Sequence, residues 1–134
     1  MNQNSPDFYI ESHEQAVQGT LDVMHHCQSL PDNQDKRVQA IVTPRFAPTC
    51  TDQLLKDLGS LAKEHDLNIQ SHVSENKGEI EWVKALFPEN QNYSDVYYTR
   101  GLLTEKTIMA HAVHLTDDEV ALFQKSKGKL DQHR

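Results

Sequence analysis

The sequence has little cysteine and no long run of apolar residues. Its two cysteines, Cys27 and Cys50, are too few for the disulfide framework of a small secreted domain, and they lack C-x-x-C spacing. The first residues resemble neither a secretory signal peptide nor an Arg-rich transit peptide. We therefore expect a cytoplasmic protein with reduced thiols and no membrane partner.

Positive charge is also scarce, since 13 Lys and Arg stand against 20 Asp and Glu and leave a net charge of −7. Nucleic-acid binding needs clustered Lys and Arg to neutralise phosphates, so this balance argues against a nucleic-acid partner. With 37% apolar residues among 134, the chain can build the modest core of one domain. We expect residues 1–134 to form that single domain.

Short apolar runs alternate with segments of helical periodicity along the chain. Residues 38–44, 67–72 and 106–113 are typical of buried strands, and segment 91–101 is either a loop or a short helix. Strands that alternate with helices form parallel sheets through right-handed crossovers, so the predicted fold class is α/β. Four helices are predicted: residues 12–30, a segment starting near Thr49 and Asp52, a stripe of Ile80, Val83 and Phe87, and one starting at Thr116.

Each predicted strand ends near a polar side chain that could serve a site. Arg45 follows the first strand, His72 ends the second and His111 lies in the third. The carboxyl ends of parallel strands meet at one edge, where functional residues of such sheets gather. Imidazole is a common zinc ligand, and Glu75 is placed to handle a proton beside the metal. The simpler alternative is that these are hydrogen-bonded loop residues, with Arg45 a surface arginine.

Three stretches carry a resemblance to a known family. "IVTPRFAPTC", "IQSHVSEN" and "LLTEKTIMAHAVHLTDDE" together resemble the guanine deaminases of the amidohydrolase superfamily, in the same order and at compatible spacing. The likeness runs from about Asp7 to Lys125. "HVSE" alone would fit many deaminases and chlorohydrolases, whereas "TPRF" followed by "SHVSENKGEIEWV" is much narrower.

The resemblance implies a zinc-bearing (β/α)₈ TIM-type barrel that hydrolyses guanine to xanthine and ammonia, in a cytosolic homodimer. It further implies that His72 and His111 ligate Zn²⁺ and that Glu75 carries the proton. Arg45 and Phe46 would hold the purine, with His72 and Glu75 also contacting it. A guanidinium can donate to the O6 and N7 acceptors of guanine, and the Phe46 ring can meet the flat base.

The chain also departs from the family pattern. The family also needs an H-x-H pair on the first barrel strand and an aspartate at the end of the last strand. This chain has no H-x-H pair, and residues 126–134, "SKGKLDQHR", read as a divergent tail where the family would continue into a further strand. A barrel needs about 250 residues. We therefore expect a partial barrel of about three parallel strands and four helices, with an incomplete zinc site and no useful turnover alone. The alternatives are a truncated, non-catalytic form that pairs with other subunits, or a fragment of an amidohydrolase acting on another heterocycle.

Overall fold

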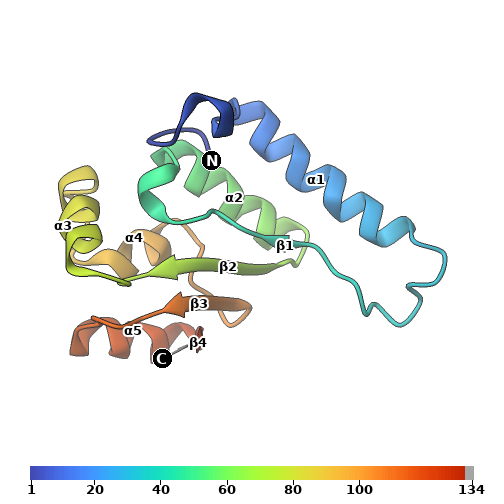
Figure 1. Ribbon diagram of the computed structural model, residues 1–134. Helices are drawn as coiled ribbons and strands as arrows, with labels where there is room; N and C mark the ends of the chain where they lie inside the picture. Colours follow the sequence, from blue (N-terminus) through green and yellow to red (C-terminus); the bar gives the residue numbers. More distant parts are fainter. Residues whose placement is uncertain (132–134) are drawn as a thin grey trace.

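The computed structural model describes residues 1–131, which form a parallel sheet with helices packed along it (Figure 1). Every neighbouring pair of strands is parallel, as the alternation of strands and helices predicts. The described part of the sheet stays open, so it matches a partial barrel and not a closed one. The strands lie in chain order: β1 (Ile41–Val42), β2 (Asn68–Val73), β3 (Thr107–His111) and β4 (Lys129–Asp131).

Helix α1 (His13–Ser29) begins where the sequence predicts. The backbone N–H of Gln15 donates to the Ser12 hydroxyl, and the backbone N–H of Ser12 donates to the Gln15 side chain. These bonds satisfy N–H groups that a first helical turn leaves without partners. α1 packs on α2 (Asp52–Glu64), with His13 Nε2 2.9 Å from an Asp57 carboxylate oxygen.

The core lies between the helices and one face of the sheet. Along β2, Ile69, Ser71 and Val73 are buried, whereas Gln70 and His72 point to the more exposed face. This alternation follows from the period of two residues in a strand. The stripe of α2 that faces the sheet comprises Leu54, Leu55, Leu58, Leu61 and Ala62, as the sequence predicts.

The remaining helices are α3 (Lys77–Leu86), α4 (Tyr93–Thr99) and α5 (Asp117–Ser126). Segment 91–101 thus contains a short helix, which starts because the Asn92 side chain accepts from the N–H of Asp95. The capping box predicted at Thr116 is present at the start of α5. Within residues 1–131, none of the helices is long and apolar enough to cross a bilayer.

The end of the chain adds a strand to the three or so that the sequence predicts. Within residues 126–134, expected as a divergent tail, Lys129–Asp131 forms β4, in parallel register with Ile108–Ala110 of β3. β4 is three residues long and exposed throughout, so it offers no alternating pattern to read. With α4 counted, the described residues hold five α-helices in place of the four predicted. Residues 132–134 of the predicted tail lie outside the described residues.

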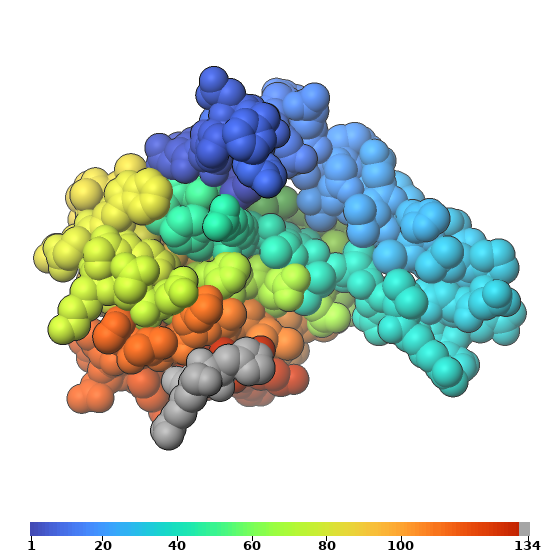
Figure 2. Space-filling view, in the orientation of Figure 1, coloured from blue at the N-terminus to red at the C-terminus, as the bar shows by residue number. Residues whose placement is uncertain are grey.

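The first residues of the chain pack against the segment that follows β1. The backbone N–H of Asn2 donates to the Thr49 carbonyl, and the Asn2 side chain donates to the Thr51 hydroxyl. The Gln3 side chain donates to the Cys50 carbonyl at 2.9 Å. Figure 2 shows this blue segment lying over the teal one. These bonds hold a 3₁₀ turn, Ala47–Thr49, that directly follows two of the predicted site residues.

A buried arginine joins α2 to α4, and we predict a large loss of stability when it is removed. Arg100 is 6% exposed, and its guanidinium donates to Asp52 at 2.7 Å and to Glu89 and Asn90 at 2.8 Å. It also lies 4.9 Å from the centroid of the Phe87 ring. Because Arg100→Met loses this whole network, its free energy of unfolding in urea should fall by about 3 kcal/mol.

The matched control is Arg37→Met. Arg37 is exposed, and its ion pair with Asp35, at 3.2 Å, is exposed as well. Such pairs contribute little, so this change should stay within about 0.5 kcal/mol. Equal losses in the two variants would contradict the role assigned to Arg100.

Candidate active site

The carboxyl ends of β2 and β3 bring two imidazoles together. The ring centroids of His72 and His111 lie 5.1 Å apart, and the ring planes meet at 22°. Both side chains are partly exposed. Parallel strands predict that these two strand ends converge, and the two rings lie at one rim.

His111 reaches this rim because its backbone leaves the regular strand conformation. In the register of the sheet, His111 pairs with Val73, whose side chain is buried on the helix-covered face. A regular strand would turn His111 to that same face, away from His72. His111 and Ala112 instead have φ angles of 73° and 52°, in the left-handed region that residues other than glycine seldom adopt. This local strain accompanies the placement of the His111 ring beside His72.

A hydrogen bond from Nδ1 orients the His72 ring. His72 Nδ1 lies 2.6 Å from the Arg45 carbonyl oxygen, which can only accept. The contact therefore assigns the proton to Nδ1 and leaves the lone pair on Nε2. Carbonyl oxygens hold metal-ligating histidines in this way, since they fix both the tautomer and the ring orientation.

Glu75 lies beside the imidazoles on the loop after β2. One of its carboxylate oxygens is 3.6 Å from His111 Nε2, and its side chain is 52% exposed. Two backbone bonds join this loop to the loop after β3: Ala112 N–H donates to the Val73 carbonyl, and His114 N–H donates to the Ser74 carbonyl. The carboxylate is thus held at the rim and open to solvent.

Arg45 and Phe46 lie on the loop after β1, where the Arg45 carbonyl contacts the His72 ring. The Arg45 guanidinium carbon lies 5.7 Å from the centroid of the Phe46 ring, and the exposed Arg45 donors are available to a ligand. Trp82 of α3 meets Phe46 edge-on, with centroids 6.0 Å apart. A tryptophan within a helix usually packs in the core, so the sequence gives Trp82 no predicted role in the site; here it is 39% exposed.

The donors at this rim fit part of a zinc site. Zinc takes imidazole nitrogen at about 2.0–2.1 Å and needs three or four protein ligands. His72 offers a free Nε2 on an oriented ring, His111 lies next to it, and Glu75 is within reach of His111. No group of three or more His, Cys, Asp or Glu side chains in residues 1–131 is arranged to hold a metal alone. The described residues therefore fit two positions of a zinc ligand set.

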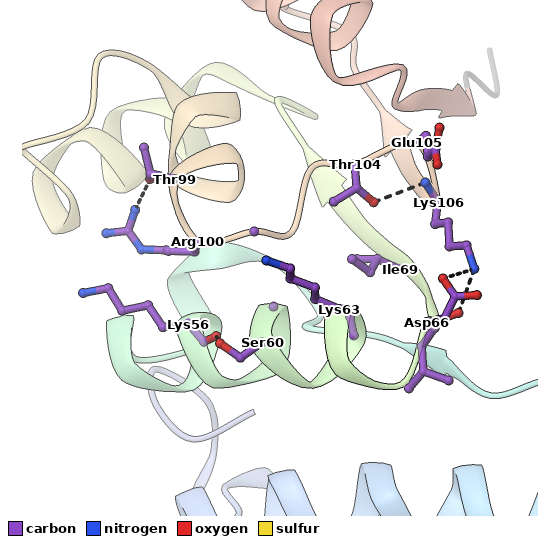
Figure 3. A pocket seen from close by; sticks show the side chains of 14 residues that line it. Lys56, Ser60, Lys63, Asp66, Ile69, Thr99, Arg100, Thr104, Glu105 and Lys106 are labelled. Carbon is purple, nitrogen blue, oxygen red and sulfur yellow. Dashed lines mark hydrogen bonds and ion pairs between the residues drawn. The ribbon is translucent and has the colours of Figure 1, made fainter.

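A cavity of about 490 Å³ lies at the opposite end of the strands (Figure 3). Its lining includes Ile69 at the start of β2 and Lys106 just before β3. Lys106 is paired there with Asp66 at 2.6 Å. No histidine among residues 1–131 lines this cavity, so the two imidazoles described above lie at the carboxyl rim and not here.

Parallel α/β architecture, with paired imidazoles and a carboxylate at the strand ends, defines a class of metal-dependent hydrolase. The Amidohydrolase family profile matches residues 6–132, and the chain belongs to this family. Among curated relatives, guanine deaminase of Dictyostelium discoideum is 49% identical over 130 residues, which are 97% of this chain and 28% of that one. The chain thus spans less than a third of the length of such relatives.

Solved structures agree with this assignment. A guanine deaminase from C. acetobutylicum, with guanine bound in its active site, superposes with a TM-score of 0.90 at 32% identity, over 97% of this chain and 30% of that one. An atrazine chlorohydrolase from Arthrobacter aurescens, complexed with zinc, has a TM-score of 0.83 at 17% identity over 96% of this chain and 27% of its own, which shows the fold alone. Members of the family are generally metal-dependent.

Two buried tyrosines behind the rim predict a loss of stability at high pH. Burial raises the pKa of both Tyr93 and Tyr97 above the ordinary value of 10.0. A group whose pKa is raised by folding leaves stability unchanged at pH values below its pKa in the unfolded chain. Stability then falls as the pH rises above that pKa, because the unfolded chain loses the proton first. The free energy of unfolding should therefore fall above pH 10, by about 1.4 kcal/mol per pH unit for each tyrosine. Urea titrations of the wild type and Tyr93→Phe measure this slope, and identical slopes would contradict the prediction.

Proposed function

We propose that this chain supplies part of the active site of a zinc-dependent guanine deaminase, which acts in purine catabolism. In this proposal Arg45 and Phe46 hold guanine, His72 and His111 ligate zinc, and Glu75 carries protons and contacts the substrate. The full assembly is a cytoplasmic homodimer. The observation that carries the proposal is the meeting of His72, His111 and Glu75 at one rim beside Arg45.

The acceptors and the flat apolar face of guanine match the side chains of Arg45 and Phe46. Guanine presents O6 and N7 as acceptors, and the planar guanidinium of Arg45 can donate to both. The Phe46 ring, supported edge-on by Trp82, offers an apolar surface to the flat base. The Arg45 carbonyl accepts from His72, so the residue that holds the purine also orients a metal ligand.

The reaction replaces the amino group of guanine by oxygen. Water attacks the amino-bearing carbon, the bond from that carbon to nitrogen breaks, and ammonia leaves to give xanthine. A bound zinc supplies the Lewis acidity that makes water a competent nucleophile near neutral pH. Glu75 accepts a proton from the attacking water at a carboxylate oxygen and delivers it to the departing nitrogen.

Residues 1–134 alone are expected to release no ammonia from guanine above background, with zinc present, because two imidazoles are an incomplete ligand set. A segment exchange tests the site itself. The 130 aligned residues of the Dictyostelium discoideum enzyme are replaced by those of this chain, and conversion of guanine to xanthine is followed by ultraviolet absorbance.

The exchanged enzyme is expected to deaminate guanine, and its His72→Ala variant is expected to fail. His114→Ala is the matched control, since His114 is exposed, lies three residues after His111, and contributes its backbone N–H to the loop. An exchanged enzyme that folds and binds zinc but leaves guanine unchanged would overturn the proposed function.

A further inference from the structure

Tyr97 of α4 is buried directly behind the rim. Its side chain is fully buried, and its ring stacks on Tyr93 with centroids 5.6 Å apart. Its hydroxyl donates to the His72 carbonyl at 2.7 Å and accepts from the backbone N–H of Ala47 at 3.0 Å. The Ser71 hydroxyl lies 3.0 Å away. A single phenol therefore contacts two strand-end segments that are distant in sequence.

These contacts join the segment that carries Arg45 and Phe46 to the segment that carries His72. Ala47 immediately follows Phe46, so its N–H anchors that loop from behind. Ser71 adds a parallel link, because its hydroxyl donates to the Pro44 carbonyl at 2.7 Å. A third contact between the two segments is that of His72 Nδ1 with the Arg45 carbonyl.

We propose that Tyr97 is a positioning residue that sets where Arg45 and Phe46 lie relative to His72. The proposal rests on the proposed function, in which those residues hold the purine and the metal. Tyr97 acts through peptide groups, since its hydroxyl donates to the His72 carbonyl and accepts from the Ala47 N–H, with the Ser71 hydroxyl 3.0 Å away. The two backbone groups that its hydroxyl contacts, the Ala47 N–H and the His72 carbonyl, both belong to the strand-end segments at the rim.

Removing the hydroxyl isolates this role from packing. Tyr97→Phe keeps the ring against Tyr93 but leaves the buried Ala47 N–H without its acceptor. Burial of an unsatisfied donor is unfavourable, so the loop after β1 should move towards water and lose its fixed position. Guanine would then have to order that loop on binding, and its affinity should fall about tenfold, which corresponds to about 1.4 kcal/mol.

The test uses the full chain with zinc present and compares the wild type, Tyr97→Phe and Tyr98→Phe. Tyr98 is the matched control: it is the next residue on α4, is partly exposed, and contacts Lys125 through its ring. Amide hydrogen exchange at Ala47 reports the loop directly, and exchange at His65 in the α2 C-cap reports general stability. Guanine binding is followed by the fluorescence of Trp82, the single tryptophan, which touches Phe46.

Tyr97→Phe should speed exchange at Ala47 about tenfold, leave His65 unchanged and weaken guanine binding about tenfold. Tyr98→Phe should change neither exchange rate and should leave guanine binding unaltered. Equal acceleration at Ala47 and His65, or unaltered exchange at Ala47, would overturn the positioning role. If Tyr97→Phe does not fold, Ser71→Ala takes its place and should shift Ala47 exchange in the same direction by a smaller factor.

The two proposals can fail separately. An exchanged enzyme that binds zinc but no guanine would count against the proposed function, while exchange at Ala47 would still decide the role of Tyr97. A chain that binds guanine with equal affinity in the wild type and Tyr97→Phe would count against Tyr97 alone.

Discussion

In the exchanged enzyme, Glu75→Gln is expected to lower kcat for guanine by about 10²–10⁴-fold. The amide keeps the size of the side chain but can neither accept the proton from water nor deliver it to the leaving nitrogen. Glu75 is half-exposed and lies 3.6 Å from His111 Nε2, so its removal should leave the fold intact. Steady-state kinetics by ultraviolet absorbance, together with the zinc content, measure the effect.

Glu81→Gln is the control for the loss of one carboxylate, because Glu81 is an exposed residue of α3. It should retain full kcat. In Glu75→Gln, the zinc content should change little, since the residue is proposed to transfer protons and not to hold the metal. A fall in zinc content that accounts for the whole loss of activity would contradict this role.

Gly59→Ala is expected to destabilise the chain by about 3 kcal/mol and to lower Tm by about 10 °C. Gly59 lies in the middle of α2, where a Cβ would overlap the backbone carbonyl oxygen of Arg100. That oxygen is backbone, so the overlap cannot be relieved by moving a flexible side chain. α2 and the α4–β3 connection would have to separate, which would disturb the buried contacts around Arg100. Thermal unfolding by circular dichroism measures the change.

Gly19→Ala is expected to have the opposite effect on the stability of the same chain. Gly19 lies within α1, and nothing comes within 4 Å of a Cβ built there. Alanine lowers the conformational entropy lost by a helical residue, so Gly19→Ala should raise stability by about 0.5–1 kcal/mol. If both alanines shifted Tm in the same direction, the close approach at Gly59 would not be the cause.

Much of the fold could be predicted because local signals agree with it. The capping boxes at Ser12 and Thr116 mark the starts of α1 and α5, and the apolar stripe of α2 marks the face that it buries. β1 is shorter than predicted, with two residues, and α4 and β4 were not assigned. These are short elements that depend on neighbours distant in sequence, so periodicity cannot reveal them.

The candidate site, like the fold, could be predicted only in part from the sequence. The convergence of His72 and His111 follows from parallel strands, and the structure places both at one rim. The left-handed backbone at His111, which turns its ring beside His72, has no signal in the sequence because Ala112 is not a residue typical of that conformation. Tyr97 lay in a segment predicted as a loop or short helix, so its place behind the rim could not be inferred.

The shared zinc site is tested most directly by titrating the chain with Zn²⁺ while the side-chain nitrogens of all eight histidines are followed by NMR. His72 and His111 are expected to shift together, with one midpoint and one zinc per chain, and His72→Ala should abolish the response of His111. Separate midpoints, or an unchanged response of His111 in that variant, would contradict a site built from both rings.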